Sequence, residues 1–158
     1  MKNNHFSRIS SFVSRLDSII LSSRGDDMQE DFGKLIVRFG TGGMLFLHGV
    51  HKLLNGIAPI KVMLAAHNVP ELIGYGVYFG EIVGPILVIL GLFARVGGAL
   101  IALSMSVAIL FAGSDTLLAL NAKGGYALEL EMFYLLGAVV VMIMGAGRFG
   151  WNIGGRLN

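Results

Sequence analysis

The chain contains no cysteine, only three prolines, and few charged residues, which make up 14% of it. The absence of cysteine excludes disulfides, thiolate catalysis and Cys-ligated clusters, and with them a thiol oxidoreductase role for this chain alone. A net charge of +2, with the basic residues near the ends of apolar segments, gives no sign of nucleic-acid binding. Hydrophobic residues, by contrast, reach 54%. This balance is far from that of soluble proteins and indicates an integral membrane protein.

The hydrophobic residues are concentrated in four segments of about 20 residues, each long enough at 1.5 Å per residue to cross a bilayer once. They lie at about residues 35–54, 74–93, 96–118 and 127–146. We therefore predict an all-α fold, an integral membrane four-helix bundle within a domain of residues 33–158. Only Ala94 and Arg95 separate the second segment from the third, which predicts a tight antiparallel hairpin.

Residues 1–32 follow a different pattern. Arg8 and Arg15 interrupt any continuous apolar run, so the segment does not resemble a signal peptide. The apolar side chains recur at helical spacing, at Phe6, Ile9, Phe12, Val13, Leu16, Ile19 and Ile20. We predict an amphipathic helix in the headgroup region of the bilayer, followed by a polar linker. Docking of the same helix on a soluble partner is the alternative.

Lysine and arginine are distributed unevenly between the two sides of the predicted spans. Three lie on one side, Lys52, Lys61 and Lys123. The other nine lie on the side of the N-terminus, at Lys2, Arg8, Arg15, Arg24, Lys34, Arg38, Arg95, Arg148 and Arg156. This positive-inside bias predicts that both termini are cytoplasmic. Arg38 lies about a turn inside the first span, and we expect its side chain to snorkel to the inner interface.

Ionisable side chains from three of the spans are expected in one layer, within the outer leaflet. A carboxylate such as Glu81, in the middle of the second span, is costly unless it is neutral or paired. Spacings of three and four residues predict that His48, His51 and Lys52 share a face of the first span. The candidates for a ligand site or proton relay are therefore His48, His51, Lys52, Tyr78, Glu81, Glu129 and Glu131.

Two of these candidates, Glu129 and Glu131, are two residues apart and so point about 200° apart on a helix. We favour Glu131 as the one that faces the bundle, because Tyr134 one turn later shares its face.

Several uses of the cluster remain open. A His or Lys paired with a Glu can simply fix the register of two helices. A metal site from His48, His51, Glu81 and a Glu of the fourth span is chemically conceivable, but we predict none, because such residues near the membrane surface more often pair than chelate. Haem ligation is disfavoured, since His48 and His51 share a helix face. A quinone headgroup could be hydrogen-bonded by His48, Tyr78 and Glu81.

The second span also carries glycines at intervals of four, Gly76, Gly80 and Gly84. This spacing lets a neighbouring helix backbone approach closely, so we predict helix packing there. Pro85 cannot donate a hydrogen bond to the carbonyl of Glu81, and we therefore expect the helix to bend at that point. The third span offers only packing surface.

Several short motifs, in this order, resemble the DoxX family over about residues 33–152. They are Leu47-His48-Gly49, Val69-Pro70, Gly80-Glu81-Ile82-Val83-Gly84, Gly91-Leu92-Phe93-Ala94-Arg95, Gly124-Gly125-Tyr126 and Gly145-Ala146-Gly147-Arg148-Phe149. The resemblance implies a multi-pass protein of the bacterial inner (plasma) membrane. The family takes its name from a subunit of an archaeal quinol oxidase, and other members are associated with membrane oxidoreductase assemblies, although most have no assigned activity.

The leading hypothesis is therefore a subunit of a membrane redox assembly, with a quinone-binding or proton-relay site in the outer leaflet. The chain alone has no catalytic motif. Its expected partners are the lipid bilayer, redox proteins and a second copy of itself. The alternatives are a non-catalytic scaffold that holds partner proteins through its glycine-rich faces, and a transporter of protons or small solutes.

Overall fold

The structure is a computed structural model that describes residues 27–112, 114–122, 124–151 and 155–158. The chain divides into two compact units, Met1–Gly33 and Lys34–Asn158, and each is considered by itself. In the first unit, residues 27–33 are helical. The amphipathic helix predicted over residues 6–20 lies outside the described residues. All that follows concerns the second unit.

The described residues form helices joined by loops, and the only β-type pairing among them is an isolated bridge between Leu120 and Tyr126. The predicted all-α class is confirmed. Residues 34–38 are helical and lead into a π-helical turn. The elements are η1 (Phe39–Gly43), α2 (Met44–Asn55), α3 (Ala58–Ala66), η2 (Glu71–Gly76), η3 (Phe79–Val83), α4 (Gly84–Leu90), α5 (Ala94–Phe111), α6 (Ser114–Leu117), α7 (Glu129–Met144) and η4 (Gly155–Leu157).

Among the described residues, two helical stretches are long and apolar enough to cross a membrane, Glu71–Leu90 and Ala94–Phe111. The four-span arrangement remains a prediction. The third predicted span is shorter than expected, because helix α5 ends at Phe111 and α6 forms a separate turn.

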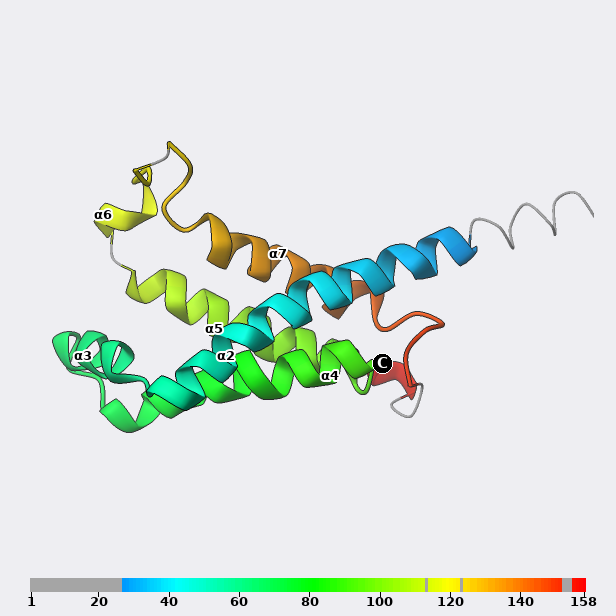
Figure 1. Cartoon of the computed structure of the whole chain (residues 1–158), viewed down its shortest axis with the longest axis horizontal. Helices are drawn as coiled ribbons and strands as arrows, with labels where there is room; N and C mark the ends of the chain where they lie inside the picture. The colour runs from blue at the N-terminus through cyan, green and yellow to red at the C-terminus, as the bar shows by residue number, and fades with distance from the viewer. Residues whose placement is uncertain (1–26, 113, 123, 152–154) are drawn as a thin grey trace, which may run out of the picture. The chain divides into compact units, whose positions relative to one another are not determined.

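Helix α5 lies at the centre of the packing, against α7 on one side and α4 and η3 on another (Figure 1). The turn η1 packs on α4 and α7, and α2 packs on η1, η3 and α4. The buried core follows these contacts and includes Leu45, Val88, Ile101, Met105, Tyr134, Ala138 and Val141. Large apolar side chains also cover the outside, as at Leu103 and Leu110, which is the pattern of helices that face lipid.

The second predicted span changes helical register around Glu81. In the π-helical turn η3, the N–H of Gly84 donates to the carbonyl of Phe79, five residues earlier, and Pro85 lies in the first turn of α4. Because Pro85 has no N–H, the carbonyl of Glu81 has no donor at that position, and it lies against Gly49 of α2. A Cβ at Gly49 would overlap this oxygen. The irregularity thus brings α2 and the backbone at Glu81 into direct contact.

Two of the three glycines predicted to mediate packing do so. A Cβ at Gly80 would overlap Ser104 of α5, and a Cβ at Gly84 would lie 3.0 Å from the carbonyl oxygen of Gly97. Gly76 differs from the prediction: it lies in η2, is exposed, and has no atom within 4 Å of the position of a Cβ. The reason is that the segment before Val77 is a 3₁₀ helix, so Gly76 does not continue the α-helical row of Gly80 and Gly84.

The expectation that Arg38 snorkels to the interface is wrong, because its side chain is buried, with 1% exposed. Its guanidinium donates three hydrogen bonds of 2.8 Å, to the carbonyls of Val88, Ile89 and Ala146. These carbonyls belong to the last turn of α4 and the segment just after α7, where helix-end oxygens lack intrahelical donors and carry the negative end of the helix dipole. Gly91, with φ of +68°, leaves the room that the guanidinium needs.

Candidate functional site

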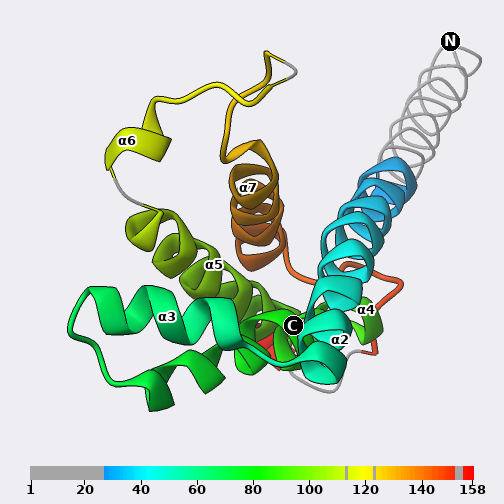
Figure 2. The same cartoon turned by 60° about the vertical axis from the view of Figure 1, so that its left-hand side comes forward.

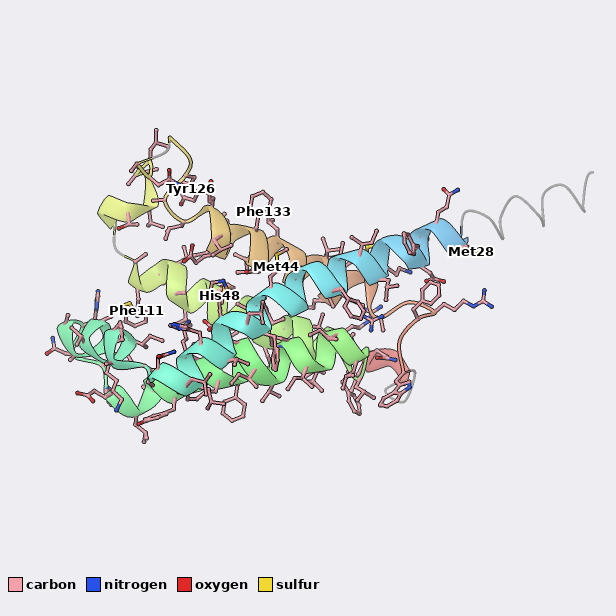
Figure 3. The ribbon with its side chains drawn as sticks, viewed as in Figure 1. Met28, Met44, His48, Phe111, Tyr126 and Phe133 are labelled. Atoms are coloured by element: carbon pink, nitrogen blue, oxygen red, sulfur yellow. The ribbon has the colours of Figure 1, made fainter. Side chains whose placement is uncertain are left out.

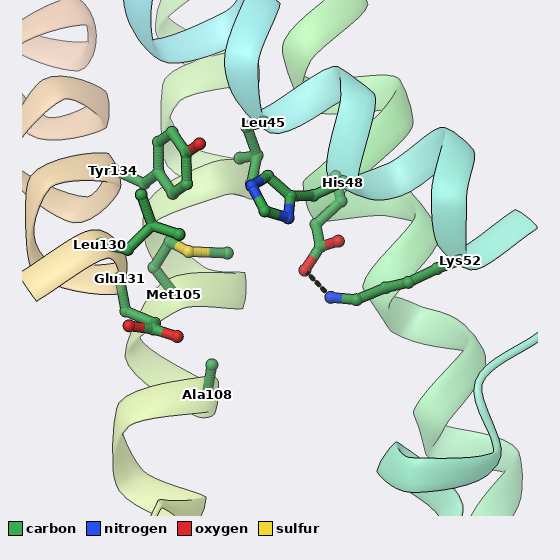
Figure 4. Close-up of a pocket in the computed structure, with 9 residues that line it drawn as sticks. Leu45, His48, Lys52, Met105, Ala108, Leu130, Glu131 and Tyr134 are labelled. Carbon is green, nitrogen blue, oxygen red and sulfur yellow. Dashed lines mark hydrogen bonds and ion pairs between the residues drawn. The ribbon is translucent and has the colours of Figure 1, made fainter. Parts of the chain in front are cut away.

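A cavity of about 100 Å³ lies between α2, η3, α5 and α7 (Figure 4). It mixes apolar side chains with five that can carry or exchange a proton. Its lining is Leu45, His48, Lys52, Glu81, Met105, Ala108, Leu130, Glu131 and Tyr134. This space is enough for several water molecules or for the polar edge of a small ring.

Glu81 is the most deeply buried charged group of the cavity, with 4% exposed. One of its oxygens, Oε1, forms an ion pair with Nζ of Lys52, whose side chain is 31% exposed. The other oxygen, Oε2, is buried and has no hydrogen-bond partner among the described residues. Buried polar atoms are nearly always satisfied, so an orphaned carboxylate oxygen beside a cavity points to a ligand, a water molecule or a proton.

His48 and Tyr134 meet across the cavity from α2 and α7. Their rings form an edge-to-face contact with centroids 5.9 Å apart and planes inclined at 73°. Tyr134 is buried, whereas His48 is exposed at the rim. Figures 3 and 4 label His48, and the close-up shows its ring directed from α2 towards Tyr134 of α7. An imidazole and a phenol, each able to donate a hydrogen bond, thus stand beside the Glu81 carboxylate.

The two glutamates of α7 lie in different surroundings. Glu131 lines the cavity, one turn before Tyr134, and is partly buried. Glu129 is exposed, and its Oε1 accepts a hydrogen bond of 3.5 Å from Asn121. This separation follows from their angular offset on the helix.

Two further predicted candidates do not line the cavity. His51 is exposed, because it lies about 100° around the helix from Lys52, on the far side of His48. Tyr78 is half-buried and donates a hydrogen bond of 3.3 Å from its hydroxyl to the main-chain carbonyl of Lys52. Tyr78 therefore ties the residues before η3 to the end of α2 and does not contribute its hydroxyl to the cavity.

The buried side of the cavity, formed by Leu45, Met105 and Tyr134, was not predicted from the sequence. The sequence analysis assigned only packing to the third span, yet α5 provides Met105 and Ala108. The three-residue step from Glu131 to Tyr134, which places both side chains on one face of the helix, was the available signal for the phenol. Among the described residues, no group of three His, Asp or Glu side chains is placed to hold a metal ion.

Comparisons with known proteins bear on the region that supplies most of the cavity. The family model of DoxX matches residues 33–114, which include His48, Lys52 and Glu81. A protein of Bacillus subtilis (strain 168) that carries the name "Putative oxidoreductase CatD" is 30% identical over 105 residues, covering 66% of this chain and 78% of that protein. No solved structure matches the chain.

Proposed function

Because the chain belongs to the DoxX family of membrane proteins, we propose that it is a four-span subunit of a redox assembly of the bacterial inner membrane, with both termini cytoplasmic. In this proposal the cavity binds a quinol or quinone headgroup and handles its proton. The oxidoreductase name of the Bacillus subtilis relative supports the redox setting. The polar side chains of the cavity support quinone binding and proton transfer as the role of this chain in that assembly.

The observation that carries the proposal is the buried, unpartnered Oε2 of Glu81. A carboxylate oxygen only accepts hydrogen bonds, so what completes this site must be a donor. The hydroxyl of a quinol is such a donor. Lys52 compensates the charge on the other oxygen, so that the carboxylate can stay ionised in the cavity and Oε2 can accept the hydrogen bond. When the quinol is oxidised and its electrons pass to the redox partner, its proton passes to Oε2.

The remaining lining fits the same headgroup. A quinone carbonyl needs a donor, and the His48 ring or the Tyr134 hydroxyl can provide one. Leu45 and Met105 present apolar surface to the face of a ring. A bound quinone supplies the electron chemistry, and the electrons pass to or from a redox partner of the assembly.

Glu131 is a second group on the cavity that can bind the proton. It lies in the first turn of α7, on the same cavity as Glu81, and it is partly exposed. Water in a cavity of about 100 Å³ can bridge two carboxylates. Protons would therefore move between Glu81 and the surface at the start of α7 by way of Glu131.

The test is the quinone content of the protein purified with native lipids. Glu81→Gln removes the acceptor and is expected to lose the co-purified quinone. Glu129→Gln is the matched control, because it makes the same chemical change on an exposed residue outside the cavity. Quinone content that is equal in wild type and Glu81→Gln would refute the proposal.

The scaffold alternative has less support. It would use the glycine-rich faces to hold partner proteins, but Gly80 and Gly84 already pack against α5 of the same chain. No particular contact of the described residues favours the transporter alternative over the quinone site.

A further inference from the structure

The cavity at Glu81 is buried on one side and exposed on the other. On the side of η3 and α5, Glu81 and Met105 are 4% and 3% exposed. On the opposite side, Leu130 of α7 is 46% exposed, and His48 of α2 is exposed as well. The mouth of the cavity therefore lies between α2 and α7.

This mouth exists because α2 and α7 pack mainly on other elements. Helix α7 packs on α5 and η1, whereas α2 packs on η1, η3 and α4. Thr41 of η1 lies against Gly137 of α7, where a Cβ would overlap the Thr41 hydroxyl. From there α2 and α7 diverge towards the end of the molecule that carries α3 (Figures 1 and 2). The contact of His48 with Tyr134 lies on the way into the gap.

Large apolar side chains flank the mouth on both helices, next to the imidazole of His48, and the floor of the cavity is polar. Met44 and Leu47 of α2 are 62% and 68% exposed, and Phe133 of α7 is 72% exposed (Figure 3). In a membrane protein such side chains face acyl chains. A molecule that enters here passes apolar side chains before it reaches Lys52 and Glu81.

We propose that the cavity is loaded sideways from the bilayer, through the mouth between α2 and α7, by a molecule with a hydroxyl-bearing headgroup and a hydrocarbon tail. The headgroup reaches Oε2 of Glu81, and the tail stays outside, along Leu47 and Phe133. This inference rests on the proposed function and adds the route and the need for a tail. A ligand taken from the aqueous phase would instead need a polar approach to Glu81.

The direct test asks whether the mouth faces acyl chains or water. The full-length protein is reconstituted with its tryptophan removed by Trp151→Phe and a reporter tryptophan introduced by Leu130→Trp. Its fluorescence is quenched either by phospholipids brominated on their acyl chains or by iodide in the buffer. Leu136→Trp, on an exposed position of α7 outside the cavity, provides the reference for full lipid contact, and Leu120→Trp, in the loop before α7, provides an exposed loop position for comparison.

Sideways loading predicts that brominated lipid quenches the reporter at position 130 as strongly as the one at 136, and that iodide has little effect on it. Strong iodide quenching with weak lipid quenching at 130 would overturn the inference. Leu47→Trp reports from the opposite rim and must behave in the same way, so the test does not depend on one variant folding.

A ligand arm separates this inference from the proposed function. Decylubiquinol and the tail-less duroquinol are each incubated with the reconstituted protein, and retention is measured after washing. Retention of decylubiquinol alone, lost in Glu81→Gln, supports both claims. Equal retention of the two quinols, still dependent on Glu81, would contradict the need for a tail and leave the proposed function standing. Retention of neither contradicts both.

Discussion

Two buried ionisable groups, Arg38 and Glu81, differ in how fully the surrounding structure satisfies their hydrogen bonds. Arg38 is 1% exposed, and three main-chain carbonyls accept hydrogen bonds from its guanidinium. Glu81 is 4% exposed, and one of its two oxygens has no partner among the described residues. The guanidinium of Arg38 is engaged by main-chain carbonyls of the helix ends that it joins. The carboxylate of Glu81 keeps one oxygen that can still accept a hydrogen bond from a ligand or water. We propose that the difference separates a structural charge from one that is available to a ligand.

The largest expected effect is at the structural charge. Arg38→Met removes the guanidinium donors of the Val88, Ile89 and Ala146 carbonyls, of which Val88 keeps a hydrogen bond of 3.2 Å from the N–H of Gly91. The cost should be roughly 3–5 kcal/mol of folding stability. Thermal unfolding of the purified protein in detergent measures it. Arg38→Lys keeps the charge but not the planar fork of donors, so it should fall between wild type and Arg38→Met. A wild-type melting temperature in Arg38→Met would show that these hydrogen bonds do not hold the helix ends together.

The next effect tests how the backbone at Glu81 is positioned. Gly49→Ala places a Cβ onto the carbonyl oxygen of Glu81 and 2.8 Å from Cγ1 of Ile82, so α2 must move away from η3. We expect a loss of about 1–3 kcal/mol in stability together with weaker quinone retention. Gly43→Ala is the control, because its Cβ would meet no atom within 4 Å and the position is helical. Equal behaviour of the two variants would argue against the contact.

A smaller loss is expected at Glu81 itself. Glu81→Gln breaks the pair with Lys52, but that side chain is 31% exposed and can be rehydrated. Stability should therefore fall by no more than about 1 kcal/mol, while quinone retention is lost. A drop in melting temperature as large as that of Arg38→Met would assign Glu81 to the structural class instead.

The smallest effect is expected at Lys61, which lies outside both regions. Its Nζ is 4.9 Å from the centre of the Tyr75 ring and 3.9 Å from an oxygen of Glu71. The neighbouring Tyr75, and to a lesser degree Glu71, raise the pKa of Lys61 above its ordinary value of 10.5. Because a raised lysine pKa favours the folded state only while the amine is protonated, this contribution is present below pH 10.5 and is lost as the pH rises through the higher folded-state pKa. Lys61→Gln should leave the melting temperature at neutral pH unchanged, and a clear drop would contradict the assignment.

The sequence was sufficient for the helical class, the family and the cavity residues that follow simple helical geometry. The four-residue step from His48 to Lys52 and the position of Glu81 predicted that these side chains could lie in one layer. His51 was expected on the same face but does not line the cavity, because it lies about 100° around the helix from Lys52. Helical periodicity gives the residues of one helix that share a face. It therefore predicts side-chain positions that depend on that helix alone.

The surroundings of Arg38 could not be predicted in the same way. Its hydrogen-bond acceptors lie 50, 51 and 108 residues away along the chain. They are main-chain carbonyls, which every residue has, so no residue type in the sequence marks them. The available signal was indirect. Gly91 and Gly145, both with positive φ, end α4 and α7 on the side where the first span starts, and Arg38 lies in the first turn or so of that span. The π-helical turn at Glu81 was also foreseen only as a bend, because Pro85 removes a donor without specifying how the chain adjusts.

The central claim is that Oε2 of Glu81 holds a proton exchanged with the quinone. Redox-induced infrared difference spectroscopy of the quinone-loaded protein tests this most directly, since it detects a carboxyl group that gains or loses a proton. The account predicts a carboxyl band that appears on oxidation of the bound quinol, persists in Glu129→Gln and is absent in Glu81→Gln. A band that is unchanged in a Glu81→Gln variant that retains quinone would contradict it.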